Sequence, residues 1–66
     1  MKISRIKLPR LRRSRQVRKL SMLALSKKAR VGHNTLYQAE HREAINLVFA
    51  ERIARALGVQ LASLRS

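Results

Sequence analysis

The chain has 66 residues, no cysteine and a formal net charge of +13. Residues 1–30 contain twelve Lys or Arg and no acidic residue, whereas residues 31–66 carry four basic residues and three acidic ones. This length permits one domain with a small core, and without cysteine neither a disulfide nor a Cys-bound zinc can reinforce that core. In a compact chain of this charge the cationic side chains repel one another unless a bound polyanion neutralises them. The composition therefore favours a small nucleic-acid-binding module.

Targeting and membrane segments find little support in the sequence. No apolar run approaches the roughly 18 residues that span a bilayer, and residues 1–20 contain no apolar stretch of the secretory type. The Arg-rich, acid-free N-terminus also fits a mitochondrial presequence. We consider this the weaker alternative, because the same residues have a more specific interpretation, given below. We therefore expect a cytoplasmic, nucleoid-associated protein without a membrane partner.

The N-terminal part divides at the only proline. Residues 1–8 alternate basic and apolar residues, and Pro9 disfavours helix at Leu8 but suits the first turn of a helix. We expect a basic arm over residues 1–8 and a domain over residues 9–66 that begins with a helix at about residues 9–19. The inner stripe of this helix is expected to be Leu11, Ser14, Val17 and Leu20.

Two short helices are expected next, on either side of a break at residues 31–32. Ser21 is a good N-cap for a helix over residues 22–29, and a further helix begins at residue 33 or 34 and runs to about Glu40. The inward residues of these two helices are expected to be Leu25, Ser26, Ala29, Leu36 and Ala39.

The C-terminal part predicts two more helices after a loop at residues 41–45. Asn46 caps a helix over residues 47–57, and Gly58 stands where a helix-ending glycine belongs. Residues 60–64 are expected to form a last helical turn, which completes an all-α fold of five short helices. The buried face of the fourth helix is expected to be Leu47, Ala50, Ile53, Ala54 and Leu57.

Several short runs occur in a characteristic order. Leu11, Arg15 and Leu20 precede S-M-L-A-L-S-K-K-A, then T-L-Y-Q-A-E, and finally I-A-R-A-L-G-V followed by L-A-S-L. In this order and spacing, residues 11–64 resemble the phage repressor and Cro class (lambda-repressor-like, XRE) of helix-turn-helix DNA-binding proteins. The resemblance implies a transcriptional regulator that binds specific duplex DNA sites, most simply a repressor that occupies a palindromic operator as a homodimer. Candidate dimer contacts are Leu61, Leu64, Val48 and Phe49.

The third expected helix has the two faces that a DNA-reading helix needs. One side is apolar, while Asn and Gln on the other side can pair bidentately with adenine and the Thr methyl can touch a thymine methyl. The resemblance aligns His33, Asn34 and Gln38 with base-reading positions, and the neighbouring polar residues flank them. Base contacts are therefore expected from His33, Asn34, Thr35, Tyr37 and Gln38. The alternative is that these residues form only the solvated face of a core helix.

Three positions depart from the family pattern. Met22 stands where the family often has a Gln that contacts phosphate, although the N-terminal N–H groups of that helix, beginning at Ser21, can still face a phosphate. Glu51 occupies a usually apolar position. Arg30 stands where the turn usually has a left-handed Gly, which costs roughly 1 kcal/mol unless the turn shifts so that Gly32 absorbs the strain.

Arg15 and Glu40 are expected to form a brace. In the family an Arg of the first helix commonly pairs with a Glu that ends the recognition helix, and these two residues align there. Glu40 is also one of only three acidic residues, so some arginine is expected to pair with it. We expect a partly buried pair that fixes the recognition helix and orients Arg15 near a phosphate, with a solvated pair worth about 0–1 kcal/mol as the alternative.

Charge alone makes the remaining basic residues candidates for phosphate contacts. Family arms of this kind can wrap around the duplex or enter the minor groove, and the alternative is a disordered solubilising tail. Contacts with the DNA backbone are expected from Lys2, Arg5, Lys7, Arg10, Arg12, Arg13, Arg15, Ser21, Met22, Lys28 and Arg42. Ordinary surface charge is expected at Arg52, Arg55 and Arg65.

The sequence offers no support for catalysis. It has no glycine-rich phosphate loop and no nucleophile–base arrangement, and Glu40, His41 and Glu43 fit exposed loop residues better than a loose metal site. We therefore expect no enzyme, no metal and no cofactor. Three rivals remain: an antitoxin that also binds a toxin protein, a basic RNA-binding protein, and a membrane-active cationic peptide.

Overall fold

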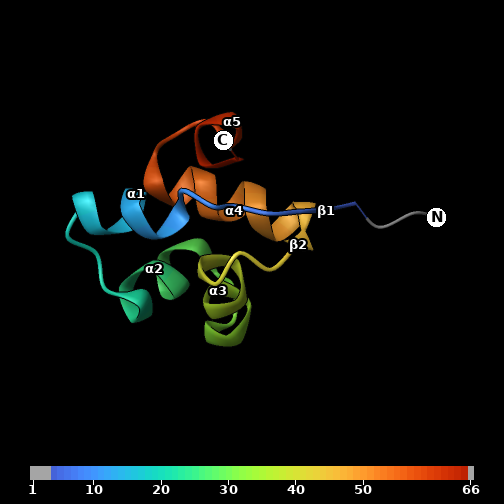
Figure 1. Cartoon of the computed structure of the whole chain (residues 1–66). Helices are drawn as coiled ribbons and strands as arrows, with labels where there is room; N and C mark the ends of the chain where they lie inside the picture. The colour runs from blue at the N-terminus through green and yellow to red at the C-terminus, as the bar shows by residue number, and fades with distance from the viewer. Residues whose placement is uncertain (1–3, 66) are drawn as a thin grey trace.

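The chain folds into five helices and one two-stranded antiparallel sheet over residues 4–65, the part that this computed structural model describes (Figure 1). The helices are α1 (Leu11–Val17), α2 (Met22–Ala29), α3 (His33–Glu40), α4 (Leu47–Leu57) and α5 (Leu61–Arg65). The strands are β1 (Arg5–Ile6) and β2 (Ile45–Asn46). The expected small helical domain with five helices is confirmed, and the sheet is an addition to it.

The helix α4 is central, with α5 on one side and α2 and α3 on the other (Figure 1). The Asn46 side chain accepts a hydrogen bond from the Val48 N–H at 2.9 Å, and Gly58 ends the helix with a left-handed φ of 70°. Both ends therefore form as predicted from local chemistry. The expected inner face is buried except for Leu47, which is only partly covered.

The helices α2 and α3 begin and end where the sequence predicts. The Ser21 hydroxyl accepts the Ala24 N–H at 3.0 Å, which caps α2. All five residues expected to point inward are buried. The link between the helices is strained at Arg30, with φ 57° and ψ 43°, whereas Gly32 is extended with φ −65°. The strain therefore stays on Arg30, and the alternative in which Gly32 absorbs it is wrong.

The inner stripe expected for α1 is only partly correct. Leu11 is buried, but Val17 is 69% exposed, and Ser14 and Leu20 are only partly covered. The helix is shorter than expected because it ends at Val17 and the chain turns with Lys19 at a φ of 55°. The missing core contribution comes from Leu8, which lies in the turn before α1 and is 1% exposed.

Residues 5–8 belong to the folded domain and not to a free arm. Arg5 pairs with Asn46 and Ile6 pairs with Ile45, and the Leu47 N–H donates to the Ser4 carbonyl at 2.9 Å. The loop expected at residues 41–45 therefore ends in a short strand whose Ile45 is buried. Two-residue strands show no periodicity, so the sequence contained no signal for this pairing.

Candidate nucleic-acid interface

The exposed side of α3 carries four of the five residues expected to contact bases. Its apolar side, Leu36 and Ala39, is completely buried against the domain, which fixes the rotation of the helix. Thr35 is partly buried beside the face. The exposed residues are His33, Asn34, Tyr37 and Gln38.

A partly buried ion pair supports α3 from α1. Arg15 Nε donates to Glu40 Oε2 at 2.5 Å, and Arg15 Nη2 donates to Oε1 at 3.1 Å. Arg15 Nη1 also donates to the Leu20 carbonyl at 2.8 Å. The Arg15 and Glu40 side chains are 13% and 3% exposed, so the expected partly buried brace is confirmed over the solvated pair. A direct phosphate contact by Arg15 stays a prediction.

A stacked ring pair orders the C-terminal end of the same face. The Tyr37 and His41 rings lie 3.8 Å apart between centroids with an interplanar angle of 23°. The His41 Nδ1 also lies 2.8 Å from the Tyr37 carbonyl oxygen. The Tyr37 ring is thus held in place although it is 49% exposed, which leaves it available to a partner.

A shallow hollow of about 220 Å³ connects α3 with the N-terminal segment. Thr35 and Gln38 line it from α3, Arg5 lines it from β1, and Asn46 and Phe49 line it from β2 and α4. Because Arg5 is paired in the sheet, its backbone is held beside α3. Sequence reasoning placed Arg5 on a free arm and could not foresee this neighbourhood.

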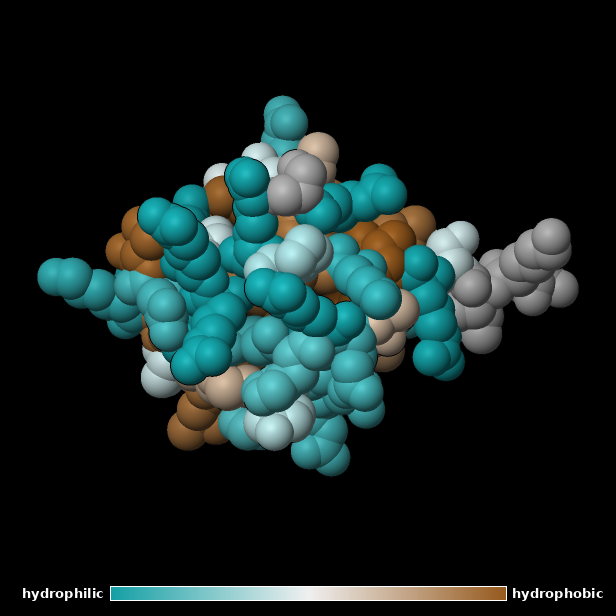
Figure 2. Space-filling view, viewed as in Figure 1, coloured by the Kyte–Doolittle hydropathy of each residue, from teal (hydrophilic) through white to brown (hydrophobic). Residues whose placement is uncertain are grey.

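The basic residues expected to contact the DNA backbone are mostly solvent-facing, and Lys2 lies outside the described residues. Ser21 is exposed, whereas Met22 is partly buried and packs against the core, which gives this methionine a packing role. The view in Figure 2 shows a largely hydrophilic face, with apolar residues in small separate areas. The exposed basic candidates are Arg5, Lys7, Arg10, Arg12, Arg13, Lys28 and Arg42.

Arg18 has a structural role that the sequence did not suggest. Its Nε donates to the Leu57 carbonyl at the end of α4 at 2.9 Å, and its Nη1 donates to the Ser14 carbonyl at 3.0 Å and to the Ser14 hydroxyl at 2.9 Å. Arginine commonly satisfies the last carbonyl groups of a helix. Its partner lies 39 residues away in the chain, which hides the contact from any local pattern.

One of the expected dimer contacts is wrong. Leu64 is 0% exposed because its side chain completes the core, so it cannot reach a second molecule. Val48 is 54% exposed, and Phe49 and Leu61 are partly buried. These three stay candidates.

Residues 4–65 offer neither a cluster of metal-binding side chains nor a membrane-spanning helix. Within that range no group of three or more His, Cys, Asp or Glu side chains lies close enough to hold a metal ion. None of the helices in the same range is long and apolar enough to cross a membrane.

Comparison with protein-family models, with curated proteins and with solved structures gave no match.

Proposed function

We propose that the chain is a sequence-specific duplex-DNA-binding regulator of transcription, of the phage repressor and Cro type. It represses by occupying a palindromic operator as a homodimer. The observation that carries the proposal is the exposed face of α3, where Asn34 and Gln38 lie beside Tyr37 on a helix whose opposite side is sealed in the core.

The dimensions and charges around α3 suit a duplex. The major groove of B-DNA is about 12 Å wide and admits an α-helix, and its base edges offer paired donors and acceptors to Asn and Gln. The capped N-terminus of α2 and the exposed Arg42 after α3 offer phosphate contacts on either side of the reading face. The buried Arg15–Glu40 pair supports a helix whose orientation decides which bases it meets.

Dimerisation follows from the size of the contact. One reading helix covers few base pairs, so a second copy on a half-site one helical turn away doubles the recognised sequence. Val48, Phe49 and Leu61 are the candidate contacts that the fold leaves open. Occupation of the operator by such a domain is sufficient for repression.

Selection of bound sites from a random duplex pool tests the proposal directly. A preferred sequence should emerge, and Asn34→Ala or Gln38→Ala should each lower affinity for that site by about 1–3 kcal/mol and relax one base position per half-site. Affinity for random duplex should hardly change in either variant. Lys7→Ala, which removes an exposed cation from the N-terminal segment, should weaken all sequences alike.

Two results would count against the proposal. Full operator discrimination in both α3 variants would show that α3 is not the reading element. Preference for structured RNA over duplex DNA in the same assay would favour the RNA-binding alternative.

A further inference from the structure

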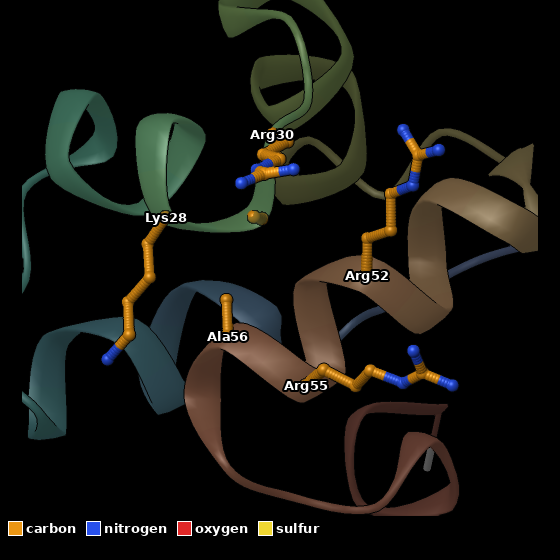
Figure 3. Close-up of a pocket in the computed structure, with 6 residues that line it drawn as sticks. Lys28, Arg30, Arg52, Arg55 and Ala56 are labelled. Carbon is orange, nitrogen blue, oxygen red and sulfur yellow. The ribbon is translucent and has the colours of Figure 1, made fainter.

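A basic cleft of about 420 Å³ lies between the C-terminal end of α2 and α4 (Figure 3). Two small residues, Ala29 and Ala56, line it together with four cationic side chains, whose charged ends extend in different directions in the view of Figure 3. The cations are Lys28 and Arg30 from α2 and the residue after it, and Arg52 and Arg55 from α4. None of the lining residues is acidic.

Within residues 4–65 none of the four cleft cations forms an ion pair with an acidic side chain. The ion pair in that range joins Arg15 and Glu40, which do not line the cleft. The Arg52 guanidinium lies over the Phe49 ring, with its Cζ 5.8 Å from the ring centroid, in a cation–π contact that brings no negative charge. Glu51, the acidic residue of α4, lines a second hollow together with Arg55, which stands four residues after it on the helix. Four like charges around one cleft repel one another until an anion enters.

The backbone at Arg30 ends α2 and fixes the position of this cation, in a left-handed conformation that Lys19 and Arg42 also hold. Glycine adopts this conformation without strain, whereas it costs an arginine about 1 kcal/mol. Arg30 also stands three residues before the start of the exposed α3 face, so a ligand at the cleft lies next to that face.

We propose that this cleft binds phosphate groups of the DNA backbone, which adds α4 to the nucleic-acid interface. The inference rests on the proposed DNA binding but not on its sequence specificity. Arginine forms paired hydrogen bonds with phosphate oxygens, and the two alanines leave room for a phosphate to approach. Arg52 and Arg55 then act as phosphate contacts and not as ordinary surface charge.

The test compares the full chain with the double variant Arg52→Gln/Arg55→Gln on a random duplex of fixed length. The slope of log K against log salt should become shallower by about one to two units, since each neutralised phosphate contributes about 0.9. The control Lys19→Gln/Arg65→Gln removes the same formal charge at exposed positions outside the cleft. Its slope should stay within about 0.5 of the parent, and thermal melts should show both variants folded.

A second variant tests the site without removing a cation. Ala56→Glu places a carboxylate in the cleft, where it competes with phosphate for Arg52 and Lys28. It should reduce the salt slope like the double variant. It keeps all four cations and lowers the net charge by one, half the change made by the control Lys19→Gln/Arg65→Gln. A loss of slope larger than that of the control therefore assigns the effect to the cleft and not to total charge.

Two measurements on the cleft variants identify the source of the phosphates. If the variants give a shallower salt slope on a single duplex, the cleft contacts the same duplex that α3 reads. If instead the variants, bound to an immobilised duplex, no longer capture a second, labelled duplex, the cleft contacts a neighbouring segment of DNA. An unchanged slope and unchanged capture in both cleft variants would overturn the inference, while operator discrimination by Asn34 and Gln38 would still support the proposed function. Absence of any duplex binding by the parent chain would overturn both.

Discussion

Glu40 carries one of three negative charges in the chain, yet its carboxylate is almost completely covered. Burial of a charge is costly unless hydrogen bonds replace the lost water, and Arg15 supplies one donor to each carboxylate oxygen. The third Arg15 contact, to the Leu20 carbonyl, ties the same guanidinium to the turn after α1. One arginine of α1 therefore connects the turn after that helix with the end of α3.

Removing either partner leaves the other buried and unpaired. We expect Arg15→Ala and Glu40→Ala each to lower the free energy of unfolding by about 2–3 kcal/mol. The double variant should lose clearly less unfolding free energy than the sum of the two single losses, because the second substitution removes the charge that the first one left buried without a partner. Urea melts of the four proteins measure this, and strict additivity would show that the pair contributes no coupling energy.

The element that sequence patterns describe worst is the N-terminal segment. Its alternation of basic and apolar residues suggests an arm, but β1 pairs with β2 and Leu8 enters the core. The two strands have only two residues each, so their stability comes from the packing of Ile6, Leu8 and Ile45 behind them and not from the ladder. Deleting residues 1–8 as a block would therefore remove core as well as charge.

Leu8 and Val17 form a matched pair for testing this arrangement. Leu8→Ala should lower the free energy of unfolding by about 2–4 kcal/mol because it opens a cavity in a small core. Val17→Ala, at the exposed end of α1, should change it by less than about 0.5 kcal/mol. Equal effects in denaturant melts would mean that the segment before α1 does not pack as described.

At the scale of the whole molecule, repulsion among the cationic side chains destabilises the fold that the hydrophobic core stabilises. A net charge of +13 is carried by a molecule 36 Å in its longest dimension. The screening length of water is about 30 Å at 0.01 M salt and about 3 Å at 1 M, so at low salt cations across the whole domain repel one another.

Salt should therefore stabilise the free protein while it weakens DNA binding. We expect the Tm in sodium chloride to rise between about 0.01 M and about 1 M, by about 4–8 °C for each kcal/mol of repulsion removed. Arg12→Gln/Arg13→Gln, which removes two exposed cations of α1, should melt higher at low salt and respond less to added salt. A Tm that stays flat or falls in calorimetry would contradict this view of the charge.

Local chemistry was sufficient to predict the helices that begin and end with clear caps. Ser21, Asn46 and Gly58 each act on backbone groups within a few residues, so the bounds of α2 and α4 follow from the sequence. The buried face of α3 follows equally from the spacing of Leu36 and Ala39. Because Leu36 and Ala39 face the core, residues on the opposite side of α3 face solvent. Most of the candidate reading face therefore follows from the same spacing.

Only the tertiary structure decided which segments meet. Leu8 is buried in the core cluster, whereas Val17 is 69% exposed and lies outside that cluster, although both stand in basic stretches with apolar residues. Leu64 is likewise sealed in the core, and the cleft cations come together from two helices far apart in the chain. Hydrogen bonds at a helix end depend on near neighbours in sequence, whereas burial and charge clustering depend on which distant elements pack together.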